Sequence, residues 1–163
     1  MRNLEDMVGK TFVEVDVGGV DNAFFVFHTA SGEKYRFIHH QDCCENVDLI
    51  DFDYDDLQLL LNSPILLAEE RSLENERPEG WYEDDAEQWT FYCLATVKGH
   101  VDIRFFGSSN GYYGVEVDVE KWDPNFEVKW MNGITKKGRW VQIPKPSILK
   151  YDPTQQGDKD EDI

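Results

Sequence analysis

The densest concentration of reactive side chains is the run from His39 to Glu45, which reads His-His-Gln-Asp-Cys-Cys-Glu. It holds two imidazoles, two thiols and two carboxylates, groups that can bind a metal, recognise a small ligand or act as nucleophile and base. The run follows the alternating apolar stretch Tyr35-x-Phe37, so it lies where a strand ends. These residues alone leave open whether the corner binds something or closes an unusual turn.

The spacing within the run argues against a metal site. Adjacent strand residues point to opposite faces, so neither His39 with His40 nor Cys43 with Cys44 can easily donate as a pair. The sequence contains no second Cys-x-x-Cys or His-x-x-x-His element, and we predict no metal and no cofactor. Adjacent cysteines rarely bridge each other, and an odd total of three cysteines indicates a reducing setting. We expect this corner to be structural, with at least one thiol buried.

A second polar corner runs from Gly107 to Gly114 and contains Ser-Ser-Asn-Gly-Tyr-Tyr. It lacks the Gly-Lys-Ser/Thr ending of a phosphate-binding loop, and its Asn-Gly pair is typical of a tight turn. Its two tyrosines are nevertheless able to form a stacking wall. The two corners together are an alternative ligand site, and no catalytic residue is predicted in either. The residues of this alternative site are His39, His40, Gln41, Asp42, Glu45, Ser108, Asn110, Tyr112 and Tyr113.

Acidic residues dominate the charge of the chain. Its 163 residues include 16 basic and 33 acidic ones, a net charge of −17, and the segment from Glu45 to Glu87 alone carries −13. This charge disfavours direct binding to nucleic acid or anionic membranes and favours a basic protein partner. Carboxylates on a rigid surface can imitate DNA phosphates, whereas a solvated, self-repelling loop is the alternative. The candidate partner-binding residues are Asp51, Asp53, Asp55, Asp56, Trp81, Tyr82, Glu83, Asp84 and Asp85.

Apolar periodicity predicts one α+β domain over residues 1–152, dominated by antiparallel sheet with one or two short helices, followed by a disordered acidic tail at 153–163. No apolar run approaches the length of a membrane span, and the first residues do not resemble a signal peptide. Helical turns are predicted at 3–9 and 53–61, and a long loop at 73–88. Strands are predicted at 11–17, 23–29, 34–39, 46–52, 64–72, 88–97, 100–106 and 115–119, with edge strands at 127–130 and 140–143.

Four stretches of the sequence form recognisable motifs. They are Lys34-Tyr-Arg-Phe-x-His-x-Gln-Asp-Cys-Cys-Glu45, Ser63-Pro-Ile-Leu-x-Ala-Glu-Glu70, Trp89-Thr-Phe-Tyr-x-Leu-Ala-Thr-x-Lys-Gly99 and Gly107-x-Ser-Asn-Gly-Tyr-Tyr113. Over roughly residues 3 to 120 they resemble a family of small, functionally uncharacterised proteins found chiefly in bacteriophages. The resemblance implies a phage origin and expression in the host bacterial cytoplasm, and it brings no catalytic residues. The segment from Lys121 onward lies beyond this resemblance and looks like an extension particular to this chain.

These observations predict a non-enzymatic phage accessory protein. It would bind and inhibit a basic host protein, one that handles nucleic acid or serves in defence, through an acidic and DNA-mimicking surface. The alternative is a protein that sequesters a small ligand or nucleotide signal at the corners 39–45 and 107–113. A third reading is a metal-dependent or cysteine enzyme.

Overall fold

The computed structural model describes residues 3–74, 86–129 and 131–143, which form two antiparallel sheets and three short 3-10 turns. The turns are η1 (Asn3–Met7), η2 (Val20–Asn22) and η3 (Asp55–Leu60). The first sheet has the order β1 (Phe12–Val17), β2 (Phe25–Thr29), β3 (Lys34–Ile38), β8 (Asp118–Lys129) and β9 (Thr135–Gln142). The second has the order β4 (Asn46–Asp51), β7 (Gly99–Ser109), β6 (Ala86–Thr96) and β5 (Leu67–Glu74).

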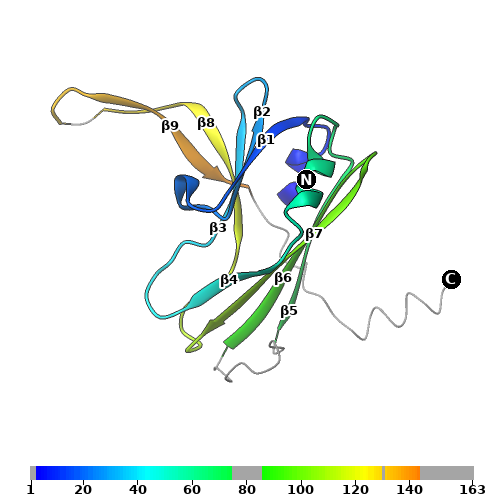
Figure 1. The fold of residues 1–163 in the computed structure, drawn as a ribbon. Coiled ribbons are helices and arrows are strands. Elements are labelled where there is room, and N and C mark those ends of the chain that lie inside the picture. The colour runs from blue at the N-terminus through cyan, green and yellow to red at the C-terminus, as the bar shows by residue number, and fades with distance from the viewer. Residues whose placement is uncertain (1–2, 75–85, 130, 144–163) are drawn as a thin grey trace, which may run out of the picture.

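The two sheets enclose one core that is rich in aromatic side chains (Figure 1). Rings from the first sheet meet rings from the second: Phe37 lies 4.9 Å from Tyr92 and Phe25 lies 6.4 Å from Phe105, centroid to centroid. The buried Tyr92 hydroxyl donates a hydrogen bond to the Val117 carbonyl at 3.0 Å, so its polar end is satisfied. The predicted single domain, dominated by antiparallel sheet, is confirmed.

The hairpin between β2 and β3 shows why the alternating pattern breaks at Thr29. The Glu33 backbone N–H donates to Thr29 Oγ1 at 3.0 Å, and Gly32 adopts a positive φ of 93° that glycine tolerates. This turn connects the two strands that the sequence predicts at 23–29 and 34–39. It also brings Glu33 to the edge of a cavity described below.

Several predicted boundaries are wrong. The predicted loop at 73–88 is shorter, because β5 continues to Glu74 and β6 begins at Ala86. The strand β8 contains residues 118–119 of the strand predicted at 115–119 and residues 127–129 of the strand predicted at 127–130. The strand predicted at 140–143 overlaps the end of β9, which begins at Thr135 and ends at Gln142. A register shift between Asp123 and Glu127 interrupts the alternation there, so the sequence pattern divides a continuous strand in two.

Two further expectations concern segments away from the sheets. The tail predicted at 153–163 lies outside the described residues. Within the part of the chain that the structure describes, no helix is long and apolar enough to cross a membrane.

Candidate functional site

The residues that connect β4 to η3 form an exposed acidic edge. We call this edge the acidic lip, and its members are Asp51, Asp53, Tyr54, Asp55 and Asp56. η3 buries Leu57 and Leu60 against the core, which leaves the two aspartates of its first turn facing water. The structure therefore brings together the four aspartates that the sequence predicted as one partner-binding group.

A local hydrogen-bond pattern holds the backbone of the acidic lip in place. Asp53 Oδ1 accepts the N–H of Asp55 at 2.9 Å and that of Asp56 at 3.4 Å. Aspartate is favoured at such a position because its short side chain can cap the free N–H groups of a helical turn. The neighbouring carboxylates consequently project from an ordered turn rather than from a loose loop.

The acidic lip contains little compensating positive charge. Arg104 Nη2 lies 2.6 Å from Asp51 Oδ2, whereas Asp55 and Asp56 make no ion pair with any described residue. Tyr54 stands among these carboxylates with 65% of its surface exposed, and its ring centre is 6.5 Å from that of Phe52. An exposed ring surrounded by carboxylates suits a basic surface that also offers apolar contact.

The remaining predicted partner-binding residues cannot be placed beside the lip. Trp81, Tyr82, Glu83, Asp84 and Asp85 lie outside the described residues. Their part in binding stays a prediction.

The corner at 39–45 is organised around Glu45, which is buried in spite of its charge. The Asp42 N–H donates to Glu45 Oε1 at 2.6 Å and the Cys43 N–H donates to Oε2 at 3.1 Å. The Gln41 side-chain amide also donates to the Glu45 carbonyl at 2.6 Å. The run thus folds back on its last residue and joins the end of β3 to the start of β4.

His39 completes this arrangement. Its Nε2 lies 3.0 Å from Glu45 Oε1 and its Nδ1 lies 2.7 Å from the Glu116 carbonyl oxygen. Both partners are oxygen acceptors, so either ring nitrogen can donate a hydrogen bond to the oxygen that it faces. The backbone N–H of Asp42, above all, holds the pKa of the Glu45 carboxyl at about 2, with further contributions from the Cys43 N–H and His39 against the opposing effect of burial.

The cysteines of this corner differ from the prediction. Cys43 and Cys44 are both exposed, and the structure pairs them as a disulfide between adjacent residues. The expected buried thiol and the expected lack of a bridge are therefore wrong. The corner buries its carboxylate because that group finds backbone donors, whereas the sulfurs need none.

The structure does bring the two polar corners side by side. His39 contacts Glu116, and Asn46, next to Glu45, pairs with Ser108 of β7. The polar atoms of His39 and Glu45 are already bonded within the protein, however, and His40 turns away to Glu120, with Nε2 3.1 Å from Oε2.

The turn of the second corner is closed by its own side chains. Asn110 Oδ1 accepts the Tyr112 N–H at 3.0 Å, and the Ser109 hydroxyl accepts the Gly111 N–H at 3.0 Å. Tyr112 is 84% exposed and meets Tyr113 edge to face at 5.0 Å. The alternative ligand residues thus gather in one region, but the polar side chains of His39, Gln41, Glu45 and Asn110 already support the two turns.

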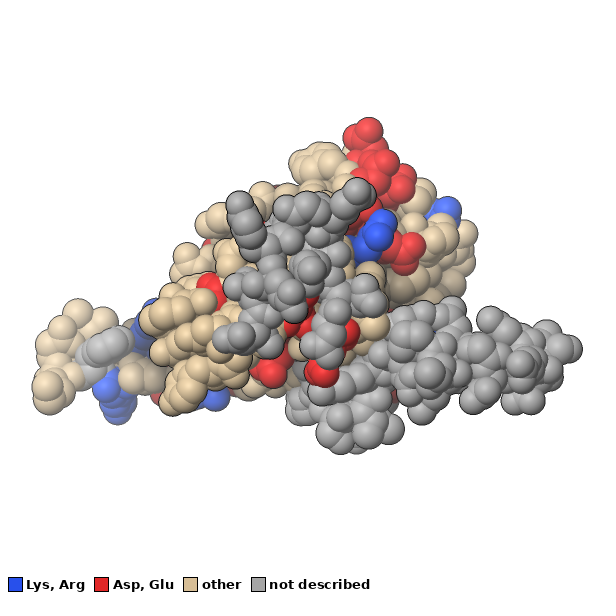
Figure 2. Space-filling view, turned by 90° about the horizontal axis from the view of Figure 1, so that it is seen from below, with Lys and Arg blue, Asp and Glu red and all other residues tan. Residues whose placement is uncertain are grey.

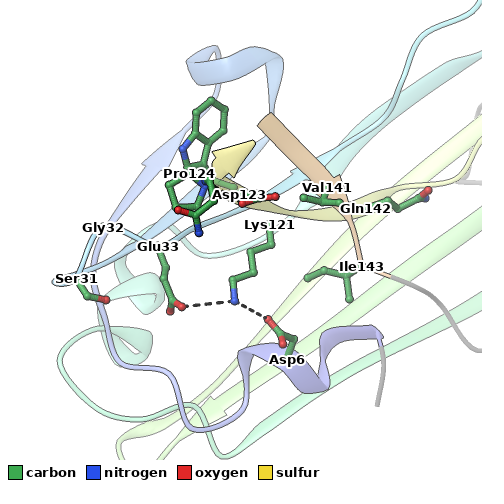
Figure 3. Close-up of a pocket in the computed structure, with 12 residues that line it drawn as sticks. Asp6, Ser31, Gly32, Glu33, Lys121, Asp123, Pro124, Val141, Gln142 and Ile143 are labelled. Carbon is green, nitrogen blue, oxygen red and sulfur yellow. Dashed lines mark hydrogen bonds and ion pairs between the residues drawn. The ribbon is translucent and has the colours of Figure 1, made fainter. Parts of the chain in front are cut away.

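The structure also contains a cavity of about 700 Å³ that the sequence did not indicate. Figure 3 shows Lys121 in it, with Nζ 3.6 Å from Asp6 Oδ2 and 3.5 Å from Glu33 Oε1. The Tyr35 hydroxyl donates to the same Asp6 oxygen at 2.7 Å, and Lys10 lies 3.0 Å from Glu33. The hydrogen bond from Lys10 lowers the pKa of Glu33, while burial raises that of Tyr35.

The ion-pair network beside this cavity joins two lysines, Lys10 and Lys121, to two carboxylates, Asp6 and Glu33, and it is suited to fixing the base of β8. Asp123 also lines the cavity. The members of the network come from segments far apart in the sequence. No local pattern or spacing could have identified them.

The geometry around Cys93 offers no support for a cysteine enzyme. This thiol is partly buried on β6, and burial, followed by the Asp102 carboxylate, raises its pKa to about 11. At neutral pH only on the order of one molecule in ten thousand would carry the thiolate needed for attack. Among the described residues, no group of three or more histidine, cysteine or acidic side chains is arranged to hold a metal ion.

No curated protein and no solved structure matches the chain. A family model matches residues 5–119, which covers most of the two sheets and ends at the second residue of β8. The matched segment overlaps the segment whose motifs resemble those of bacteriophage proteins. The phage origin stays a prediction. The chain belongs to the family described as Domain of unknown function (DUF7448).

Proposed function

We propose that the protein is a non-enzymatic bacteriophage accessory protein that acts in the host bacterial cytoplasm. It binds a basic host protein through the acidic lip and blocks the work of that protein on nucleic acid or in defence. The observation that supports this most is the Asp53 cap, which fixes in one ordered turn two exposed carboxylates that form no ion pair with a described residue.

An ordered carboxylate array has two advantages over a mobile acidic loop. Less conformational entropy is lost when a partner binds, since the backbone is already fixed. The charges also keep constant positions, as the phosphates of DNA do, so a surface that evolved to bind phosphates meets a similar pattern. The lip offers Asp53, Asp55 and Asp56 in this way.

The rest of the molecule supports such an encounter. A net charge of −17 attracts a basic protein before contact and speeds association at low salt. At contact, Tyr54 provides the apolar anchor that an interface built only from carboxylates would lack.

The proposal can be tested by capture and titration. The wild-type protein is used to capture a basic partner from host lysate, and the purified partner is then titrated against the triple variant Asp53→Asn/Asp55→Asn/Asp56→Asn. Asparagine keeps the capping ability at position 53, so the turn should remain folded. The matched control is Glu14→Gln/Glu69→Gln/Asp102→Asn, which removes the same number of charges from exposed positions outside the lip.

We expect the lip triple variant to weaken binding by about tenfold or more, and the control to weaken it much less. Raising the salt concentration should reduce the difference between them, because screening shortens the range of the attraction. Equal losses of affinity in both variants would mean that the partner responds to the overall negative charge of the protein and not to the lip in particular. Affinity that ignores both the triple variant and salt would reject the proposal.

A further inference from the structure

The outer part of β8 and β9 projects from the two sheets as a separate ribbon, which we call the arm and define as residues 122–141 (Figure 1). β8 pairs with β3 as far as Lys121, and from Trp122 to Lys129 the pairing described for it is with β9 alone. The family match ends at residue 119, so the arm lies outside the matched segment.

The base of the arm is firmly braced. Trp122 and Trp140 meet edge to face at 5.4 Å, with Lys34 Nζ 4.6 Å above the Trp122 ring and the Arg36 guanidinium 4.5 Å above the Trp140 ring. Gly138 lies directly against Trp122, where a Cβ atom would come within 2.1 Å of the ring. These contacts set the direction of the arm at its base, but they do not reach the outer half of the arm.

The outer half is short of stabilising contacts. A two-stranded ribbon is at best marginally stable in water unless it packs on something. Here its apolar side chains are exposed instead: Met131 fully, Ile134 by 61% and Val128 by 38%. Such a tip would gain order from a partner surface that covers these side chains.

The arm also has a charge opposite to that of the body. It contains four basic and two acidic residues, a net charge of +2, so the rest of the chain carries −19. Lys137 pairs with Glu127 at 3.3 Å, whereas Lys129 and Lys136 make no ion pair with any described residue. Figure 2 shows Lys and Arg side chains on the arm at the left and Asp and Glu side chains over the body.

The positive charge at the tip of the arm lies far enough from the negative charge of the body for salt to screen the two from each other. The six steps from Asp123 to Lys129 span about 20 Å at the rise of a strand. The Debye length at physiological salt is about 8 Å, so the tip presents its own positive charge rather than the average of the molecule. A partner for the tip should therefore be acidic and should also offer an apolar or aromatic contact.

We infer that the tip of the arm docks on the acidic lip of a second copy of this protein. The lip has both required features. Asp55 and Asp56 form no ion pair within the described part of the chain, and Tyr54 is exposed between the carboxylates. In Figure 1 the arm points away from β4 and η3 of its own chain, so its own lip is out of reach. Because arm and lip are different surfaces, a single arm-to-lip contact is head to tail and leaves one arm and one lip open for further copies.

This inference rests on the proposed function in so far as both use the acidic lip, but the evidence for self-association comes from the arm. A second copy and a basic host protein would compete for the same carboxylates, so self-association would hold the lip until a tighter-binding partner displaces it. The two ideas fail separately, because arm variants retain an intact lip for the host protein.

The first test is the dependence of mass on concentration, measured by sedimentation at physiological salt. We expect the wild type to form dimers and larger species as concentration rises, and Lys129→Glu/Lys136→Glu to weaken association by about tenfold or more. The single change Lys136→Glu is compared with Arg71→Glu, an exposed substitution of equal charge on β5, which should leave association unchanged. A wild type that stays monomeric at every concentration would overturn the inference.

The second test uses charge exchange. Asp55→Lys/Asp56→Lys should also weaken association, and joining these changes with Lys129→Glu/Lys136→Glu in one chain should restore it, because each surface again meets its opposite. A mixture of Asp55→Asn/Asp56→Asn with Lys129→Ala/Lys136→Ala should form pairs that grow no further. A combined variant that stays monomeric, or arm-dependent binding of duplex DNA by a monomeric wild type, would contradict the docking on a second copy.

Discussion

The corner at 39–45 and the acidic lip lie at opposite ends of β4, and both are rich in carboxylates, yet they are built in opposite ways. Glu45 turns inward, where two backbone N–H groups and His39 surround it. Asp55 and Asp56 turn outward and meet no described cation. The difference shows that the number of acidic residues does not identify a binding surface. What matters is whether the protein itself already supplies the donors.

The largest effect should come from removing the inward carboxylate. Glu45→Ala leaves the N–H groups of Asp42 and Cys43 and one nitrogen of His39 without their acceptor in a buried place, which is costly. We expect the melting temperature to fall by several degrees or more, measured by circular dichroism. The matched control is Asp42→Asn, a neighbouring exposed side chain, which should change it little. Equal behaviour of the two variants would remove the contrast between corner and lip.

The same contrast predicts a dependence on pH. The pKa of Glu45 is lowered from 4.5 to about 2, so its charged form is favoured in the folded state. The stabilisation is therefore complete above pH 4.5 and is lost as the pH falls from 4.5 towards 2. Urea midpoints of the wild type and Glu45→Gln should differ most near neutral pH and converge in this acid range. A difference that stays constant down to pH 2 would show that the carboxylate's charge is not what stabilises the corner.

How far the sequence could predict these features depends on whether their cause is local. Alternation predicted the β-rich fold, and the Thr29 to Glu33 turn was readable because its contacts lie within the turn. The four aspartates of the lip were also found, since they are neighbours in sequence. The role of Glu45 was not, because it carries the same chemical group as the lip and differs only in the donors that the folded backbone brings to it.

Contacts between distant segments set the remaining limit. Lys121 belongs with Asp6 and Glu33 only because β8 pairs with β3, a pairing that no spacing in the sequence announces. The strand β8 was divided into two predicted strands, at 115–119 and 127–130, for a related reason. Its register shift is a property of the paired strands and not of either strand alone.

Outward groups should affect binding rather than stability. Tyr54→Ala removes an exposed ring from the lip, and we expect it to weaken binding of the basic host partner by about 2 kcal/mol while the melting temperature stays nearly unchanged. Tyr112→Ala is the control, since Tyr112 is also exposed but belongs to the turn beside the buried corner. Isothermal titration gives the affinity of each. Similar losses for both tyrosines would mean that the partner covers far more than the lip.

The smallest effect should come from the cysteines, although they are the most conspicuous residues of the corner. Both side chains are exposed, and the group that Cys43 gives to Glu45 is its backbone N–H, which serine retains. Cys43→Ser/Cys44→Ser also removes the disulfide, but a bridge between adjacent residues closes so short a stretch of chain that the free energy of unfolding should change by only about 1 kcal/mol. Urea unfolding of this variant beside Glu45→Ala measures the two halves of the corner separately. A loss as large as that of Glu45→Ala would mean that the sulfurs, and not the carboxylate with its backbone donors, hold the end of β3 to the start of β4.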